Sequence, residues 1–448
     1  MLPEIKNGYG VFETAQEACD AAAAAQRDFV RNYSLEDRDK FIGSIRKRAM
    51  EAISELAQME LDETGYGRLE DKLNKTTGAI MLSQGTEALP QNMYASDKGL
   101  TVEYYAPFGV VGAVTPVTNP AATIFGNGIA NTAAGNAVVF NAHPSAKITS
   151  AFTCQLVNKA IVEAGGPENL FTMPRLPDLK TLDVIMGHPA VRLLVGTGGP
   201  GMVRTLMSSG KKVIAAGAGN PPSIIDETAD PAAAAAGLLG SCSFDNNLLC
   251  IAEKEVFVVD TIFDDFCQEF IKAGAKMLTK EEGKIMTERC LVKTPDGEYA
   301  ANKKYVGKCA NIILRDCGVA CDDDPRVAFF EAENSDPLVQ TEQMMPIIPF
   351  VRCKNFDEAM DWAYKAEHGN LHSASIWSKN CDRVTAFGTI INTTIFVQNG
   401  GTMAAFGVGG SGTNSPTIAT PTGEGVTGPQ SFVRRRRFCM AGGTNYLL

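Results

Sequence analysis

The segment with the clearest chemical potential runs from Ser243 to Cys250 and reads Ser-Phe-Asp-Asn-Asn-Leu-Leu-Cys. It is polar and then apolar, and it comes just before the apolar run 256–259. A cysteine thiolate attacks carbonyl carbons readily, so Cys250 is a candidate covalent nucleophile. The chain has 12 cysteines, however, and a cysteine is commonly a small buried residue. Spacing alone does not reveal the thiolate character that a reactive cysteine needs.

A glycine-rich turn, Gly196–Gly201, follows the apolar run 191–195 and precedes a helical pattern. Glycines let the backbone approach a phosphate closely, and the free N–H groups at a helix start attract an anion. The same residues also suit an ordinary strand-to-helix turn, and their spacing departs from G-x-G-x-x-G. A phosphate site and an ordinary strand-to-helix turn are therefore equally good interpretations of this segment.

Three other polar positions allow two interpretations each, and a glycine-rich segment allows one. Asn119, between a strand and a helix, suits either an oxyanion donor or a helix cap, and local structure alone favours the cap. His372 suits a core or a surface position. The run Arg434–Arg437 suits a solvated or oligomer-facing surface, or an anion contact, and Gly409–Gly412 suits a flexible loop without the frame of a nucleophile elbow.

The elements that must position these residues alternate between strands and helices, which predicts parallel sheets covered on both faces. A long amphipathic helix is predicted over 36–64, with Ser34 as its cap and Gly65 as its stop. A first series then follows: strands at 110–114, 137–140, 191–195 and 213–215, and helices at 121–134, 145–164 and 199–208. A second series has strands at 256–259, 347–351, 374–377 and 395–397, and helices at 263–277 and 356–366. The loop 216–222 is the predicted hinge, and the segment 417–448 fits neither core.

Composition narrows the class of protein. A chain of 448 residues is expected to form two or three domains. The net charge of -10 argues against an extended nucleic-acid interface, which needs a basic face. The chain shows no secretory signal pattern at its start and no apolar run near the ~20 residues that cross a bilayer. Scattered cysteines without paired C-x-x-C clusters indicate reduced thiols in a cytoplasm and no zinc site.

Taken together, the motifs resemble the aldehyde dehydrogenase superfamily, and closely its CoA-acylating branch. The chain looks most like the propionaldehyde and acetaldehyde dehydrogenases of bacterial microcompartments, and the resemblance runs over nearly its whole length. The stretches that carry it are Thr118–Pro120, Leu194–Gly201, Gly210–Pro222, Ser243–Lys254 and Ile418–Gly425.

The resemblance implies an α/β, aldehyde dehydrogenase-like fold: two α/β domains with parallel sheets plus a small oligomerisation element. The domains it implies are a cofactor-binding domain over 1–92 and 110–220, a catalytic domain over 221–411, and an oligomerisation element over 93–109 and 412–448.

The resemblance also implies roles for individual residues. Cys250 matches the nucleophile, and Asn119 matches the side chain that holds the oxyanion together with the Cys250 backbone N–H. Glu342 matches the carboxylate that contacts the nicotinamide ribose. His372 matches a histidine of acylating relatives that helps to deprotonate a thiol. The residues expected to bind the cofactor besides Glu342 are Thr197, Gly198, Gly199, Pro200, His143 and Pro144.

Ala216 marks an informative departure. Hydrolytic members of the superfamily carry there a glutamate that activates water, whereas alanine has no proton-accepting group. Without that base, water attacks a thioester slowly, and a thiol such as that of coenzyme A is the better nucleophile near neutral pH. The departure favours transfer of the acyl group to coenzyme A, although another carboxylate could replace the missing one.

The predicted reaction is the reversible, NAD-dependent oxidation of a short-chain aldehyde, propionaldehyde or acetaldehyde, to acyl-CoA through a thioester on Cys250. The alternatives are a hydrolytic dehydrogenase that releases free acid and a non-catalytic microcompartment scaffold. We also expect a homo-oligomer, either dimer or tetramer, in the cytoplasm and inside a microcompartment. We expect the relatives' amphipathic leader to be absent or to have been removed, because the match begins almost at once, at Gly10–Phe12. NAD versus NADP, the chain length of the aldehyde and the role of His372 stay open.

Overall fold

The computed structural model describes residues 2–442, and within them the chain divides into two compact units. The first unit comprises residues up to 64, residues 73–216 and those from 414 onward. The second comprises residues 65–72 and 217–413. The predicted cofactor domain included 65–72, which the structure groups with the second unit. The functions assigned to the domains remain predictions.

The first unit is built on a six-stranded parallel sheet in the order β1-β6-β5-β4-β7-β8. Its central strands are apolar on both faces because helices cover both, which explains their continuous apolar runs. The strands are β1 (Val11–Phe12), β4 (Val110–Thr115), β5 (Ala137–Ala142), β6 (Phe171–Pro174), β7 (Val191–Thr197) and β8 (Lys212–Ala216).

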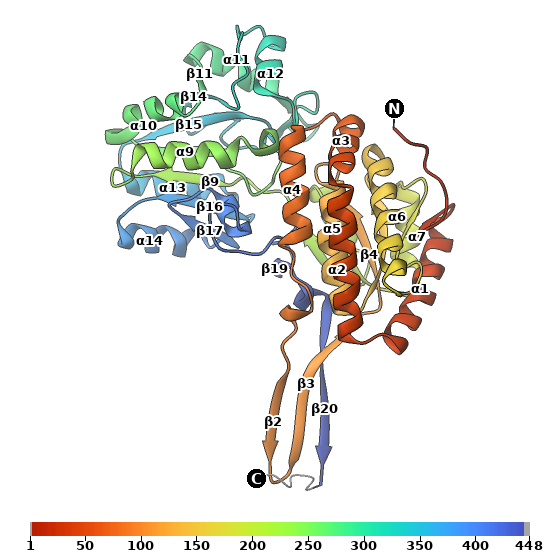
Figure 1. Ribbon diagram of the computed structural model, residues 1–448. Coiled ribbons are helices and arrows are strands. Elements are labelled where there is room, and N and C mark those ends of the chain that lie inside the picture. The colour runs from red at the N-terminus through yellow and green to blue at the C-terminus, as the bar shows by residue number, and fades with distance from the viewer. Residues whose placement is uncertain (1, 443–448) are drawn as a thin grey trace. The chain divides into compact units, whose positions relative to one another are not determined.

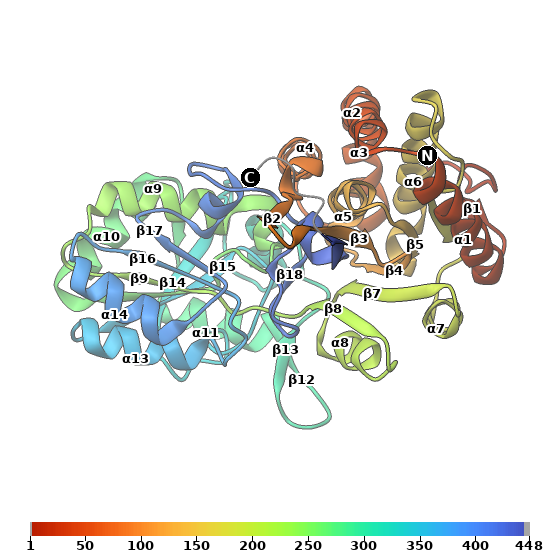
Figure 2. The same ribbon diagram turned by 90° about the horizontal axis from the view of Figure 1, so that it is seen from below.

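Helices α5 and α6 pack together on one face of this sheet with α2 over them, while α1 and α7 pack together on the other face (Figure 2). The chain makes here α1 (Ala15–Asn32), α2 (Leu35–Glu51), α3 (Ile53–Thr64), α5 (Pro120–Ala134), α6 (Lys147–Glu163), α7 (Leu179–Gly187) and α8 (Pro200–Met207), and α4 (Leu69–Met81) begins in the second unit. The helices α1, α4 and α7 and the strands β1 and β6 were not predicted from the sequence.

The prediction of a single helix over 36–64 is wrong, because the structure has two helices there, α2 and α3. Ser34 caps α2 through a capping box, as predicted, and Gly65 (φ +64°) follows the end of α3. The break falls at Ala52, whose N–H bonds to the carbonyls of both Arg48 and Ala49. The apolar face continues across the break, so the periodicity carried no sign of it.

The second unit has a seven-stranded parallel sheet in the order β11-β14-β15-β10-β9-β16-β17. The strands are β9 (Pro222–Ile225), β10 (Glu255–Val259), β11 (Lys276–Met277), β14 (Ala328–Ala332), β15 (Ile347–Cys353), β16 (Ser373–Trp377) and β17 (Ile395–Gln398). Figure 2 shows α9 (Pro231–Cys242) and α10 (Asp260–Lys272) on one face, with α13 (Phe356–Ala366) and α14 (Cys381–Ile391) on the other. The helix α11 (Lys280–Cys290), which packs against β14, leads into a hairpin of β12 (Leu291–Lys293) and β13 (Tyr299–Ala301), followed by α12 (Ala310–Asp316).

The prediction of a helix over 263–277 is wrong at the C-terminal end of that range. The helix α10 stops at Lys272, Gly274 adopts φ +113°, and Lys276–Met277 forms the edge strand β11. The left-handed glycine turns the chain back into the sheet, which an α-helix cannot do.

The segment that fitted neither core completes a separate antiparallel sheet. Strand β20 (Val433–Ala441) pairs with β3 (Gly99–Pro107), which pairs with β2 (Asn92–Ser96), and the three run side by side as an arm of the first unit (Figure 1). Between the first unit's core and this arm, β18 (Ile418–Ala419) and β19 (Gly425–Val426) form a short antiparallel pair. Residues 443–448 of the predicted oligomerisation element lie outside the described residues.

The predicted fold class is confirmed: two α/β units with parallel sheets. None of the helices within residues 2–442 combines the length and the apolar character needed to cross a membrane.

Candidate active site

The predicted cofactor residues of the first unit gather at the carboxyl edge of its sheet. Since β5, β4, β7 and β8 are parallel neighbours, the residues that follow them meet at one edge. His143, Asn119, Gly198 and Ala216 stand at the ends of these four strands. Open α/β sheets bind ligands outside this edge, so the fold brings these positions together where a cofactor would bind.

The glycines of the 196–201 turn serve different purposes. A Cβ on Gly196 would come within 2.2 Å of Leu206 of α8, so this glycine lets the helix pack on its strand. Positions 199 and 201 have open space instead, with no heavy atom within 4 Å of a Cβ there. Gly199 is the N-cap of α8, and no side chain caps the helix. An uncapped helix start beside open glycines fits a pyrophosphate.

Thr197, His143 and Pro144 flank this edge. The Oγ1 of Thr197, at the end of β7, lies 3.3 Å from the Oγ1 of Thr417. The Nδ1 of His143 accepts a hydrogen bond from the backbone N–H of Ser145 at 3.2 Å, and Pro144 begins a short 3-10 helix, 144–146. These residues lie at this edge of the sheet, and their contact with a cofactor stays a prediction.

Asn119 is the N-cap residue of α5 by position, yet its side chain makes no capping hydrogen bond. Its Oδ1 is buried without a hydrogen-bond partner among the described residues. The preceding carbonyl, that of Thr118, accepts a hydrogen bond from Lys75 Nζ at 3.0 Å. The capping interpretation is therefore wrong, and the side chain is available for a ligand.

In the second unit, Cys250 lies in a turn between α9 and β10, and it is partly exposed. The N–H of Ala252 bonds to the carbonyl of Leu249, which closes the turn around the thiol. The carbonyl of Ile251 accepts hydrogen bonds from the hydroxyls of Ser373 (3.3 Å) and Thr402 (2.6 Å). The turn is thus tied to the strand β16 and to the 3-10 helix 402–406.

Three predicted catalytic and cofactor residues meet around Gly219. A Cβ on Gly219 would lie 2.8 Å from the carbonyl oxygen of Cys250 and 2.8 Å from Cγ of His372. The N–H of Gly219 donates to Oε1 of Glu342 at 3.3 Å. The glycine therefore brings the backbone of Cys250, an imidazole and a carboxylate together within one unit.

Burial governs the ionisation of these groups. Together with the Glu342 carboxylate, it raises the pKa of the Cys250 thiol to about 12, and the ammonium of Lys254 opposes the rise. Burial also raises the pKa of Glu342, against the effects of Lys254 and of the Gly219 N–H. The thiol is protonated at neutral pH, so attack requires that its proton be removed.

His372 is buried and neutral. Burial, helped by the charge of Lys254, lowers its pKa to about 4. Its Nδ1 lies 2.9 Å from the hydroxyl of Ser373, which donates onward to the Ile251 carbonyl. Since that hydroxyl has one hydrogen, Nδ1 carries the proton in this arrangement, and Nε2 is left as a bare acceptor without a partner among the described residues.

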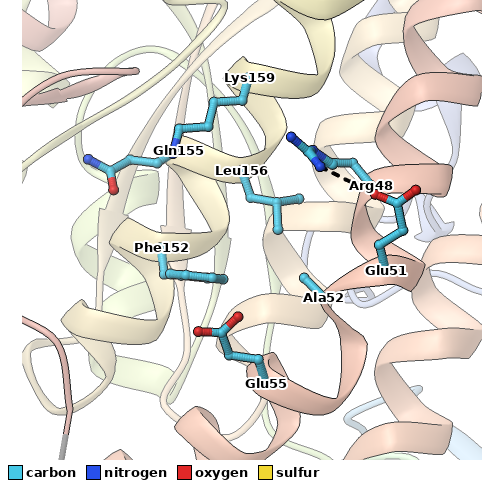
Figure 3. Close-up of a pocket in the computed structure, with 8 residues that line it drawn as sticks. All are labelled: Arg48, Glu51, Ala52, Glu55, Phe152, Gln155, Leu156 and Lys159. Carbon is cyan, nitrogen blue, oxygen red and sulfur yellow. Dashed lines mark hydrogen bonds and ion pairs between the residues drawn. The ribbon is translucent and has the colours of Figure 1, made fainter.

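A groove elsewhere in the first unit contains none of these residues. It has a volume of about 280 Å³ and lies between the α2–α3 junction and α6 (Figure 3). Its lining consists of Arg48, Glu51, Ala52, Glu55, Phe152, Gln155, Leu156 and Lys159. Within residues 2–442, no group of three or more His, Cys, Asp or Glu side chains is arranged to hold a metal ion.

The sequence did not point to Lys254 or Gly219, nor to the buried left-handed residues Asp245–Asn247 that precede Cys250. A lysine four residues after a cysteine has no chemical signature of its own. The signal that was available is the run Asp245–Asn247, whose residue types tolerate left-handed backbone better than others do.

Comparison with known proteins supplies the family. The model of the aldehyde dehydrogenase family matches residues 9–290. The propanal dehydrogenase (CoA-propanoylating) of Salmonella typhimurium is 39% identical over 98% of this chain and 94% of its own length. An acetylating acetaldehyde dehydrogenase of the same organism is 40% identical over 96% of this chain and 91% of its own length.

Solved structures agree. A propionaldehyde dehydrogenase from the fucose utilisation microcompartment of Clostridium phytofermentans has a TM-score of 0.94 and 42% identity, covering 98% of this chain and 100% of that one. The propionaldehyde dehydrogenase of Rhodopseudomonas palustris, solved with bound propionyl-CoA, has a TM-score of 0.93 and 41% identity, covering 97% and 96%. The resemblance drawn from the motifs is confirmed: the chain belongs to the aldehyde dehydrogenase family.

Proposed function

We propose that the protein is an oxidoreductase that converts a short-chain aldehyde into its acyl-CoA through a thioester on Cys250, in a reversible reaction. The observation that carries the proposal is the convergence of Cys250, Glu342 and His372 around Gly219. Relatives about 40% identical over nearly the whole chain carry the names of CoA-acylating dehydrogenases, which supports the same reaction class.

In the first half of the reaction, the sulfur of Cys250 attacks the aldehyde carbon, and the proton of the thiol is released to solvent. The carbonyl oxygen becomes an oxyanion, which needs preorganised hydrogen-bond donors. The proposed donors are the backbone N–H of Cys250 and the side-chain amide of Asn119, whose side chain is not used as a helix cap.

Bound NAD supplies the acceptor for the hydride that leaves the former aldehyde carbon. The residues proposed to hold it are Thr197–Pro200, His143, Pro144 and Glu342. The uncapped start of α8 and the open glycines suit its pyrophosphate. The Glu342 carboxylate is oriented by the Gly219 N–H and is proposed to contact the nicotinamide ribose.

In the second half, the thiol of coenzyme A attacks the thioester and Cys250 leaves as the thiolate. The proposed proton acceptor for the incoming thiol is the bare Nε2 of His372. Its low pKa makes it a weak base, so its contribution depends on proton transfer in the transition state. Ala216, at the end of β8, offers no base for water, and this disfavours hydrolysis.

The test is an NADH assay with propanal and NAD, with and without coenzyme A, on the wild type and on Cys250→Ala. We expect coenzyme A to raise the steady rate at least ~10-fold with propionyl-CoA as product, and Cys250→Ala to abolish NADH formation. Equal rates without coenzyme A and free acid as product would establish the hydrolytic alternative. No turnover under any condition would favour a scaffold, and near-normal turnover by Cys250→Ala would remove the nucleophile assignment.

Acetaldehyde and propanal are the proposed substrates, because relatives acting on each are about equally similar. Both are small aldehydes, so a series from acetaldehyde to butanal, compared by kcat/KM, ranks them. The cofactor is proposed to be NAD, and the same assay with NADP decides between the two.

We also propose that the protein is a homo-oligomer that assembles through the arm of β2, β3 and β20. The registers Met93↔Val102↔Phe438 and Ala95↔Leu100↔Met440 place these six side chains on one face of the sheet. Met93 and Phe438 are 72% and 52% exposed, so this apolar face is uncovered within one chain. A location in the cytoplasm within a microcompartment rests on the relative from such a compartment.

A further inference from the structure

The three residues Asp245, Asn246 and Asn247 form an unusual stretch of backbone upstream of Cys250. They have φ values of +49°, +56° and +61°, and all three are fully buried. Consecutive left-handed residues other than glycine are disfavoured and persist only where their surroundings hold them. Such strain occurs preferentially at functional sites, and contacts at both ends of this stretch hold it in place.

The upstream end of the stretch is anchored to residues 65–72 of the same unit. The N–H of Asp245 donates to Asp71 Oδ2 at 2.9 Å, and Asp245 Oδ1 accepts from the N–H of Arg68 at 3.0 Å. The Nδ2 of Asn246 donates to the carbonyl of Gly307 at 2.9 Å. These contacts hold the beginning of the stretch, away from the thiol.

The downstream end is held by Lys254, whose side chain is completely buried. Its Nζ donates to the carbonyls of Asn247 and Leu249, both at 2.9 Å, and also to Oδ1 of Asn247. The Nδ2 of Asn247 in turn donates to the carbonyls of Cys242 (2.7 Å) and Glu253 (2.9 Å). One ammonium group therefore fixes the two peptide groups that precede Cys250 at positions 247 and 249.

The charge on Lys254 also acts on the site. Burial lowers its pKa, while Glu342, Cys250, Glu255 and Glu253 favour its charged form. In return, the ammonium lowers the pKa of Cys250 against the effect of burial. A buried cation close to a thiol stabilises the thiolate strongly, because little water screens the interaction.

We propose that Lys254 is a positioning residue for Cys250, with Asn247 as its partner. Its ammonium clamps the peptide groups that lead to the thiol and supplies the positive charge that favours the thiolate. The inference rests on the proposed role of Cys250 as the nucleophile. It goes further in assigning the orientation and activation of that thiol to a residue four positions downstream.

The charge is tested by alkylation of Cys250 with iodoacetamide at pH 8, followed on the Cys250 peptide by mass spectrometry. We expect Lys254→Met to slow alkylation about 10-fold, the effect of one pKa unit. A merely structural role predicts the opposite sign, because a loosened turn exposes the thiol and speeds alkylation. Unchanged or faster alkylation in a folded Lys254→Met protein would therefore overturn the charge role.

Two further variants complete the test. Lys365→Met removes a lysine from the surface of α13 and should leave alkylation unchanged. Asn247→Gly keeps the Lys254 charge and suits the left-handed backbone. It therefore tests whether the contacts between Lys254 and Asn247 position Cys250, even if Lys254→Met does not fold. We expect a kcat about 10-fold lower, with alkylation at pH 8 and the KM for NAD within about twofold of wild type.

A wild-type kcat in Asn247→Gly would contradict the proposal that Lys254 and Asn247 position Cys250. Failure of the proposed nucleophile is distinguishable from these outcomes, since it appears as turnover by Cys250→Ala, whereas alkylation of the Cys250 peptide reads the thiol itself and requires no turnover.

Discussion

Gly219 is the single residue on which the geometry of the site depends most. Its missing side chain lets the Cys250 carbonyl and the His372 ring approach, and its N–H orients Glu342. Neither neighbour is the free end of a flexible chain, so a methyl group at this position must displace the Cys250 turn or the segment with His372 that leads into β16.

We therefore predict that Gly219→Ala lowers kcat/KM for propanal about 100-fold, the effect of a misplacement of about 1 Å. The matched control is Gly240→Ala in α9, where a Cβ meets no atom within 4 Å. The control should keep wild-type kcat/KM and gain about 0.5–1 kcal/mol of stability from helix propensity. Equal kcat/KM for the two variants would show that the contacts of Gly219 are dispensable.

The pH dependence of Cys250 follows from its surroundings. With the thiol pKa raised to about 12, the thiolate fraction of the wild type rises about tenfold per pH unit below that value. His372, with its pKa lowered to about 4, stays neutral between pH 6 and pH 9 and adds no step. We predict that alkylation of the Cys250 peptide rises log-linearly between about pH 6 and pH 9, and a plateau near pH 7 would contradict the account.

Among the elements, the sequence predicted four strands of each parallel sheet and the helices α5, α6, α8, α10 and α13, because apolar periodicity records burial directly. The sequence left the buried strands β6, β9 and β14 unpredicted. It did not reveal the break at Ala52 or the end of α10, where the apolar pattern continues past the turn. It also left β20 unplaced. Four successive arginines give no alternation, and the partner strand β3 lies more than 300 residues away in the chain.

The candidate site, like the fold, could be predicted only in part from the sequence. Composition left Cys250 and Asn119 ambiguous, and the family motifs raised both to candidates. Three other features of the site depend on three-dimensional contacts that residue spacing does not encode. They are the buried Oδ1 of Asn119 without a partner among the described residues, the approach of Cys250, His372 and Glu342 to Gly219, and the hydrogen bonds of Lys254.

The proposed assembly through the arm of β2, β3 and β20 can be tested by substitution on its apolar face. Phe438→Glu places a charge on its apolar face beside Val102, and burying that charge in an interface would be costly. We expect a lower oligomeric state in sedimentation velocity, with the thermal transition of the α/β units kept. Leu179→Glu, at a 69% exposed position on α7, is the control that should sediment like wild type. If both variants sediment like wild type, the arm does not form the interface.

For the whole molecule, we propose that an acyl group passes from the aldehyde to Cys250 and then to coenzyme A. Each of the two units contributes one recognisable part: an uncapped helix start at the carboxyl edge of one sheet, and a clamped cysteine turn beside the other. The family membership links these parts to a single reaction, in which the thioester is the intermediate common to both halves.

The most direct measurement is therefore a single turnover. The protein is mixed with propanal and NAD in the absence of coenzyme A, and the Cys250 peptide is examined by mass spectrometry before and after coenzyme A is added. We predict a propionyl thioester on Cys250 that disappears on addition of coenzyme A, with an equivalent amount of propionyl-CoA formed. NADH formation with an unmodified Cys250, or a thioester that coenzyme A does not discharge, would contradict the account.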